Sequence, residues 1–183
     1  FNQVLQIAQE QYGFEIKRHP SKEIHTGFLN DTWNVDIFVK QHGPSIKNCD
    51  QLGGWHIWNG KVWQKDETHQ IIKLADDTVR SFYSMASKFD DGSKEQKLFF
   101  QHIKLSGNEN KIRAMVNLAR SRAQVSIVSD EFDANPYLLN CQNGVFDLKS
   151  DCFLEHCPDL MLSKICQTSY DKDAKCPHWE EFL

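Results

Sequence analysis

The sequence predicts an α+β fold that is mainly helical, with small antiparallel β-hairpins. Apolar residues recur at helical spacing over several segments, and Asn-Gly pairs separate short apolar runs at Asn59-Gly60 and Asn143-Gly144. An Asn-Gly pair between apolar runs is the strongest short-range signal of a hairpin. The length of 183 residues fits one domain with an appendage, and an apolar content of 40% is enough for a sizeable core.

The first 28 residues are predicted to form an N-terminal helix and a linker. Apolar residues over 1–14 follow a helical stripe that ends at Gly13. The polar stretch over 15–27 is interrupted by Pro20, which favours a linker. The sequence therefore divides into the region 1–28 and a domain over 29–183.

Four further helices are predicted in that domain. Asn30 or Asp31 can cap the first, over 29–42, and Gly43 followed by Pro44 ends it. The other three are expected over 66–88, 94–105 and 108–122. The longest, 66–88, has an inward stripe of Ile71, Ile72, Ala75, Val79, Phe82 and Ala86.

The two hairpins flank this run of helices. In the first, Trp55, Ile57 and Trp63 are expected to share one small core, and packing is favoured over the alternative of a stacking platform for single-stranded bases. In the second, Asn143-Gly144 is expected to form a type I′ turn with positive φ at both residues.

Several classes of function are excluded or disfavoured. The sequence contains no GxxxxGK[ST], GxGxxG, GxSxG or HExxH motif, so a Walker-type phosphate loop is absent. No apolar run approaches the ~20 residues of a membrane span. The net charge of −4 argues against a protein that coats nucleic acid through a global positive field, but it allows a local basic face.

One local basic group is a candidate site for DNA phosphates. It consists of cations on or beside the helix 108–122, namely Lys104, Lys111, Arg113, Arg120 and Arg122. The alternative interpretation is a solvated helix face, in which the arginines near the helix end interact only with its dipole.

Two groups of residues are candidate metal sites, and each has a simpler interpretation. Asp130, Glu131 and Asp133 could hold a cation in a metal-dependent nuclease, but a polar loop before Asn135 is favoured. The six cysteines are irregularly spaced and lack a CxxC pair, so we expect reduced, metal-free thiols. The alternative is a zinc-binding interaction module built from Cys152, Cys157, Cys166 and Cys176 with His156 or His178.

Several segments together resemble one family. They are LNDTWNVDIFVKQHG, GGWHIWNGKVWQKDE, NKIRAMVNLARS, NCQNGVFDL and DAKCPHWEEFL, and the last two are the most specific. In order and spacing they resemble, over about 29–183, the middle domain that precedes a superfamily 3 helicase. That domain occurs in phage- and plasmid-type primases and in poxvirus primase–helicases.

The resemblance implies an accessory or collar domain in the replication of a phage, plasmid or other mobile element. The chain begins with Phe1 and contains no helicase motif, so we expect a fragment that ends where the helicase would begin. The parent would be a hexamer that binds ATP and Mg²⁺. Its partners would be single-stranded or forked DNA and the adjacent helicase and primase domains, in the cytoplasm of a bacterial host or a virus-infected cell. No catalytic residue carries over, and no cofactor is expected in this chain.

Overall fold

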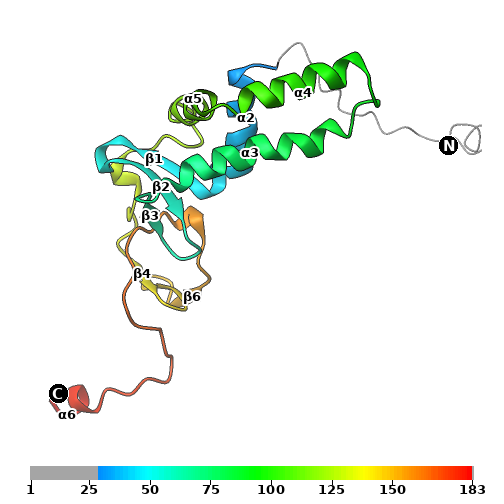
Figure 1. Cartoon of the computed structure of the whole chain (residues 1–183). Coiled ribbons are helices and arrows are strands. Elements are labelled where there is room, and N and C mark those ends of the chain that lie inside the picture. Colours follow the sequence, from blue (N-terminus) through cyan, green and yellow to red (C-terminus); the bar gives the residue numbers. More distant parts are fainter. Residues whose placement is uncertain (1–28, 183) are drawn as a thin grey trace, which may run out of the picture.

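The computed structural model describes residues 29–182. Figure 1 shows a helical part at one end, a three-stranded sheet beside it, a second three-stranded sheet beyond that, and a C-terminal tail that leads away to α6. The helices are α2 (Asp31–His42), α3 (Gln70–Ala86), α4 (Lys94–Ser106), α5 (Glu109–Ala119) and α6 (Pro177–Phe182). The α+β prediction is confirmed. The helix and linker predicted for 1–28 lie outside the described residues.

Side-chain caps set the starts of the main helices. The Asn30 carboxamide oxygen accepts a hydrogen bond from the Trp33 N–H, as predicted, and Ser93 caps α4 in the same way. Asp66 was expected inside the helix predicted over 66–88, but it lies before α3. Its carboxylate accepts the backbone N–H groups of Gln70 and Ile71, so it acts as the cap, and α3 begins four residues later than predicted.

The four long helices bury one continuous apolar core. Every predicted inward residue of α3 except the half-buried Ile72 is fully buried, and α5 contributes Ile112, Met115, Val116 and Ala119. The first sheet lies against this core through Trp55 and Ile57. The apolar residues that recur at helical spacing in the sequence are therefore the residues that pack in the core.

The first sheet has the order β1 (Ile46–Cys49), β2 (Gly54–Trp58), β3 (Trp63–Lys65), all antiparallel. Trp58 is paired with Trp63, and alternate residues of a strand face opposite sides, so Trp63 lies on the face opposite Trp55 and Ile57. It packs in a second cluster with Cys49 and Phe132. The predicted single core for the three residues is wrong, because this sheet is buried on both faces.

The second sheet has the order β4 (Leu138–Cys141), β5 (Gly144–Asp147), β6 (Cys152–Leu154), also antiparallel. The predicted hairpin is present, but its turn is not type I′. Cys141 pairs with Gly144, so the turn residues are Gln142 and Asn143, and neither has a positive φ. Gly144 is the first residue of β5 instead.

Hydrogen bonds rather than a shared ladder connect the two sheets. The Trp63 backbone N–H donates to the Leu162 carbonyl at 2.9 Å, and its indole N–H donates to the Pro158 carbonyl at 2.9 Å. The Asn140 side-chain amide donates to the carbonyls of Lys61 and Lys164. The chain after Leu162 then runs along β4, and we name residues 163–170 the C-terminal strap.

Candidate nucleic-acid interface

The five predicted cations surround α5, which packs against α2. Two of them hold these helices together. Lys111 lies 2.8 Å from a carboxylate oxygen of Asp31, and Arg122 lies 2.9 Å from one of Asp36, both on α2. The pairs are 80 and 86 residues apart along the chain, so sequence spacing carries no signal of them. Lys111 and Arg122 therefore have a structural role before any ligand is considered.

The other three cations are differently placed. Arg113 is exposed and pairs with Glu109 one turn earlier at 2.8 Å. Lys104, near the end of α4, and Arg120, which caps the end of α5, are exposed and form no ion pair within residues 29–182. Arg113 and Arg120 are seven residues apart and so lie on one side of the helix, about 180° from Lys111. The predicted basic group is thus divided between two sides of α5.

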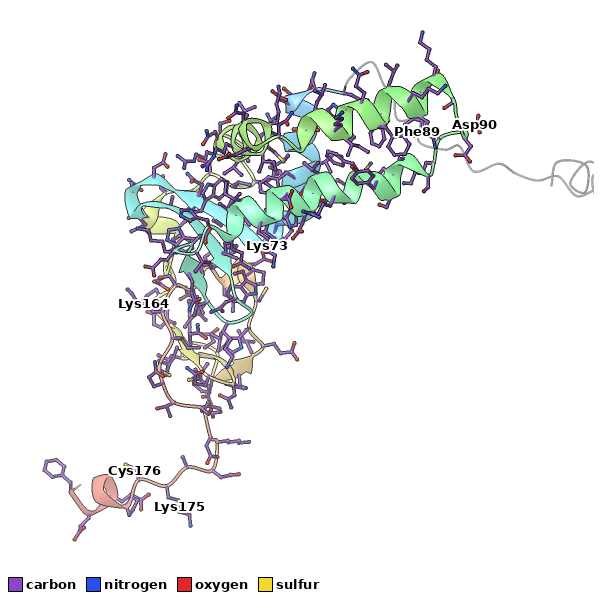
Figure 2. All side chains as sticks on the ribbon, viewed as in Figure 1. Lys73, Phe89, Asp90, Lys164, Lys175 and Cys176 are labelled. Carbon is purple, nitrogen blue, oxygen red and sulfur yellow. The ribbon has the colours of Figure 1, made fainter. Side chains whose placement is uncertain are left out.

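A cleft of about 690 Å³ lies beside this exposed side, between the starts of α3 and α5. Lys73 of α3 and Arg113 of α5 both line it, with the apolar floor formed by Ile72 and Ile112. Figure 2 shows Lys73 near the end of α3 that lies closest to the first sheet. No local pattern joins Lys73 to the basic group, because the residue belongs to another helix. Two carboxylates, Asp76 and Glu109, also line the cleft, and each is paired with an arginine.

The carboxylates of Asp130, Glu131 and Asp133 accept hydrogen bonds from neighbouring groups of the chain. Glu131 accepts the Val128 N–H at 2.9 Å and closes a short 3₁₀ turn. Asp133, at a positive φ of 52°, accepts both the N–H and the hydroxyl of Ser163. Asp130 accepts the Ser129 hydroxyl. Within residues 29–182, no three or more His, Cys, Asp or Glu side chains gather as a metal site would require. The polar-loop interpretation fits these contacts.

The cysteines carry free thiols. Cys152 and Cys176 are exposed, and Cys49 is buried in the cluster with Trp63. The two thiols that do meet are Cys141 and Cys166, whose sulfurs are 3.6 Å apart. The zinc hypothesis did not pair these two residues, because Cys141 precedes the group that it considered.

Trp33, Trp55, Trp58 and Trp63 take part in packing. Trp55 and Trp63 are buried, as the hairpin-core interpretation predicted, and Trp58 contacts Trp63 with ring centroids 5.8 Å apart. Trp33 packs on Phe82 at 4.9 Å. Trp55 and Trp63 are therefore closed to bases from solvent, and Trp33 and Trp58 are partly buried against other aromatic rings.

One histidine, His102, joins a hydrogen-bond network in the helical core. The His102 Nε2 lies 2.8 Å from the Asn34 carboxamide oxygen, and the Asn34 amide donates to the Ser106 hydroxyl at 2.9 Å. Asn34 and Ser106 are fully buried, and burial lowers the pKa of His102. The network satisfies polar groups between α2 and α4.

The sequence of this chain matches a known protein family. The family described as D5 N terminal like matches residues 35–183, from within α2 to the end of the chain. The chain belongs to this family. No curated protein matches it.

The D5 N terminal like family is the N-terminal domain of D5-like primase–helicases, so the predicted resemblance to a pre-helicase domain is confirmed. The context of this D5-type domain is DNA replication. The match covers most of α2, all of α3 to α6 and both sheets, so the basic side of α5, the cleft and the strap all lie within the family domain. No described helix is long and apolar enough to cross a membrane.

Proposed function

We propose that this D5-type domain is the accessory, collar-like domain of a replicative primase–helicase. It would support assembly of the hexamer and engage single-stranded or forked DNA beside the helicase and primase domains. The observation that carries the proposal is the family match over 35–183. The chain has no phosphate loop, so ATP and Mg²⁺ would act in the helicase domain of the parent.

The DNA contact would use the cations of α4 and α5 that are open to solvent. Lys104 and Arg120 are exposed and have no carboxylate partner within 29–182, so a phosphate meets no competing ion pair there. The exposed pair of Arg113 with Glu109 contributes only about 0.5 kcal/mol, so a phosphate can replace Glu109 at little cost. Lys111 and Arg122 would add to the positive field while they remain bound to α2.

Titration of fluorescently labelled single-stranded DNA at several salt concentrations tests this assignment. The three open cations Lys104, Arg113 and Arg120 would make three phosphate contacts, which give a log–log salt slope of roughly −2 on single strands. In the variant Lys104→Ala/Arg120→Ala, the slope should become shallower by about 1.4, and the affinity should fall. The net charge of −4 keeps the DNA affinity of one copy low, and a hexamer would raise the affinity by presenting several copies.

Two matched variants separate a local contact from a general loss of charge. Lys88→Ala/Lys94→Ala removes two exposed cations at the other end of the α3–α4 pair and should bind DNA as the wild type does. Lys111→Ala/Arg122→Ala should lower the thermal midpoint, because it breaks both links between α5 and α2. Equal loss of binding in the first variant and in Lys104→Ala/Arg120→Ala would contradict the assignment to α4 and α5. An absence of binding in all proteins would limit the domain to assembly, which sedimentation velocity measures.

A further inference from the structure

Two thiols meet where the C-terminal strap crosses the end of β4. Cys141 is the last residue of β4 and is buried, and Cys166 lies on the strap and is half-buried. Their sulfurs are 3.6 Å apart. A disulfide needs about 2.05 Å, so the sulfurs must approach by only about 1.5 Å, which a small side-chain rotation can supply.

Hydrogen bonds on both sides of the thiols hold the strap in this position. The Cys166 N–H donates to the Asn140 carbonyl at 2.9 Å, and the Gln142 N–H donates to the Thr168 carbonyl at 3.0 Å. Asn143 and Tyr170 then exchange two bonds, each joining the side chain of Asn143 to the backbone of Tyr170. These hydrogen bonds therefore hold the two cysteines next to each other in the folded chain.

We propose that Cys141 and Cys166 form a peroxide-sensitive oxidation site, whose disulfide fastens the strap covalently to β4. The thiolate of Cys166 attacks one oxygen of hydrogen peroxide, the O–O bond breaks, and water leaves after proton transfer. The Cys141 sulfur then attacks the sulfenic sulfur of Cys166, the S–S bond forms, and a second water leaves. Two thiols are oxidised and one peroxide is reduced to two waters.

The order of attack follows from the environments of the two thiols. Burial raises the pKa of Cys141, so its thiolate is scarce at neutral pH. Cys166 is the more accessible of the pair, so it meets the oxidant first, and Cys141 is already in place as the resolving thiol. The proposal is independent of the function proposed above, because it uses no residue of the basic side of α5.

Peptide mapping by mass spectrometry after treatment with hydrogen peroxide tests the site. Trypsin cleaves after Lys149, Lys164 and Lys172, so Cys141, the pair Cys152 and Cys157, and Cys166 fall in three separate peptides. We expect the peptides over 123–149 and 165–172 to be joined, with a loss of about 2 Da from the intact protein that dithiothreitol reverses. Amide exchange at Gln142 and Cys166 should slow on oxidation, because the strap can no longer lift from β4.

Two variants that each replace one cysteine complete the test. Cys166→Ser should abolish the joined peptides and leave Cys141 unoxidised, since its burial protects it. Cys152→Ser, at an exposed cysteine, should leave the product unchanged. The proposal is overturned if peroxide gives only independent +16 Da products, if the disulfide joins Cys152, Cys157 or Cys176, or if the joined species is an intermolecular dimer.

Discussion

Gly144 lies at the point where β5 meets β6, and the space around it predicts the effect of a side chain there. A Cβ atom built on Gly144 would lie 2.5 Å from Cζ of Phe153 and 2.6 Å from the carbonyl oxygen of Leu154. The Phe153 ring is 42% exposed, so it can move outward. The Leu154 carbonyl cannot move in the same way, because Leu154 pairs with Val145 in the ladder between β5 and β6.

We therefore expect Gly144→Ala to lower the free energy of unfolding by about 1–3 kcal/mol, as overpacking usually does. For a chain of this size each 1 kcal/mol lowers Tm by about 2–4 °C, so a loss of about 3 kcal/mol should lower Tm by about 6–12 °C. Gly144→Val should cost more, because it adds two methyl groups to the same space. Thermal unfolding followed by circular dichroism measures the shift.

Two comparisons make the test specific to the clash. Gly107→Ala is the matched control, since a Cβ there would be 3.6 Å from its nearest atom, and its Tm should stay close to that of the wild type. Gly144→Ala/Phe153→Ala removes one of the two clashes and should cost less than the sum of its single variants. A Tm for Gly144→Ala within about 1 °C of the wild type would refute the spacing of β5 and β6 on which the prediction rests.

Three further outcomes are expected. Burial lowers the pKa of three histidines, so the unfolded state takes up protons first as pH falls. The free energy of unfolding should be highest above about pH 6.5 and should decline below it until the folded-state pKa values are passed. Urea unfolding at pH 7.5 and 5.5 will measure the difference. These histidines are His42, His56 and His102. Trp63→Phe removes the indole donor to the Pro158 carbonyl and should cost about 1–3 kcal/mol in urea unfolding, whereas unchanged stability would show that the bond contributes nothing. The purified domain should not hydrolyse ATP with or without single-stranded DNA, because it has no phosphate loop, and measurable phosphate release would contradict this.

The sequence predicted the helices well because local signals define them. Asn30 and Ser93 supply the caps, and the apolar spacing of α3 and α5 matches their buried faces. The strands were predicted less completely. β1 and β6 are four and three residues long, and β6 has no buried residue, so neither carries the alternating pattern that marks a strand. The type I′ turn failed because the pairing register moved the turn one residue earlier, and register depends on the partner strand.

The candidate site was harder to predict because its decisive contacts join distant residues. The charge pattern of the sequence indicated a basic group around α5, but the carboxylates that pair with Lys111 and Arg122 lie on α2. Lys73 enters the same region from α3. The thiol pair of Cys141 and Cys166 was missed for the same reason, since 24 residues separate the two and only the strap brings them together. Local periodicity contains no information about such approaches.

The strap shows how side chains can fix a segment that has no regular structure. Asn140 is buried and uses its amide to bind one carbonyl beside the first sheet, at Lys61, and one on the strap, at Lys164. A single side chain therefore couples the first sheet, β4 and the start of the strap. Lifting the strap would leave a buried amide donor without its partner, which costs about 1–3 kcal/mol. The side chain of Asn140 thus adds to the backbone hydrogen bonds of Cys166 and Gln142 in holding the strap on β4.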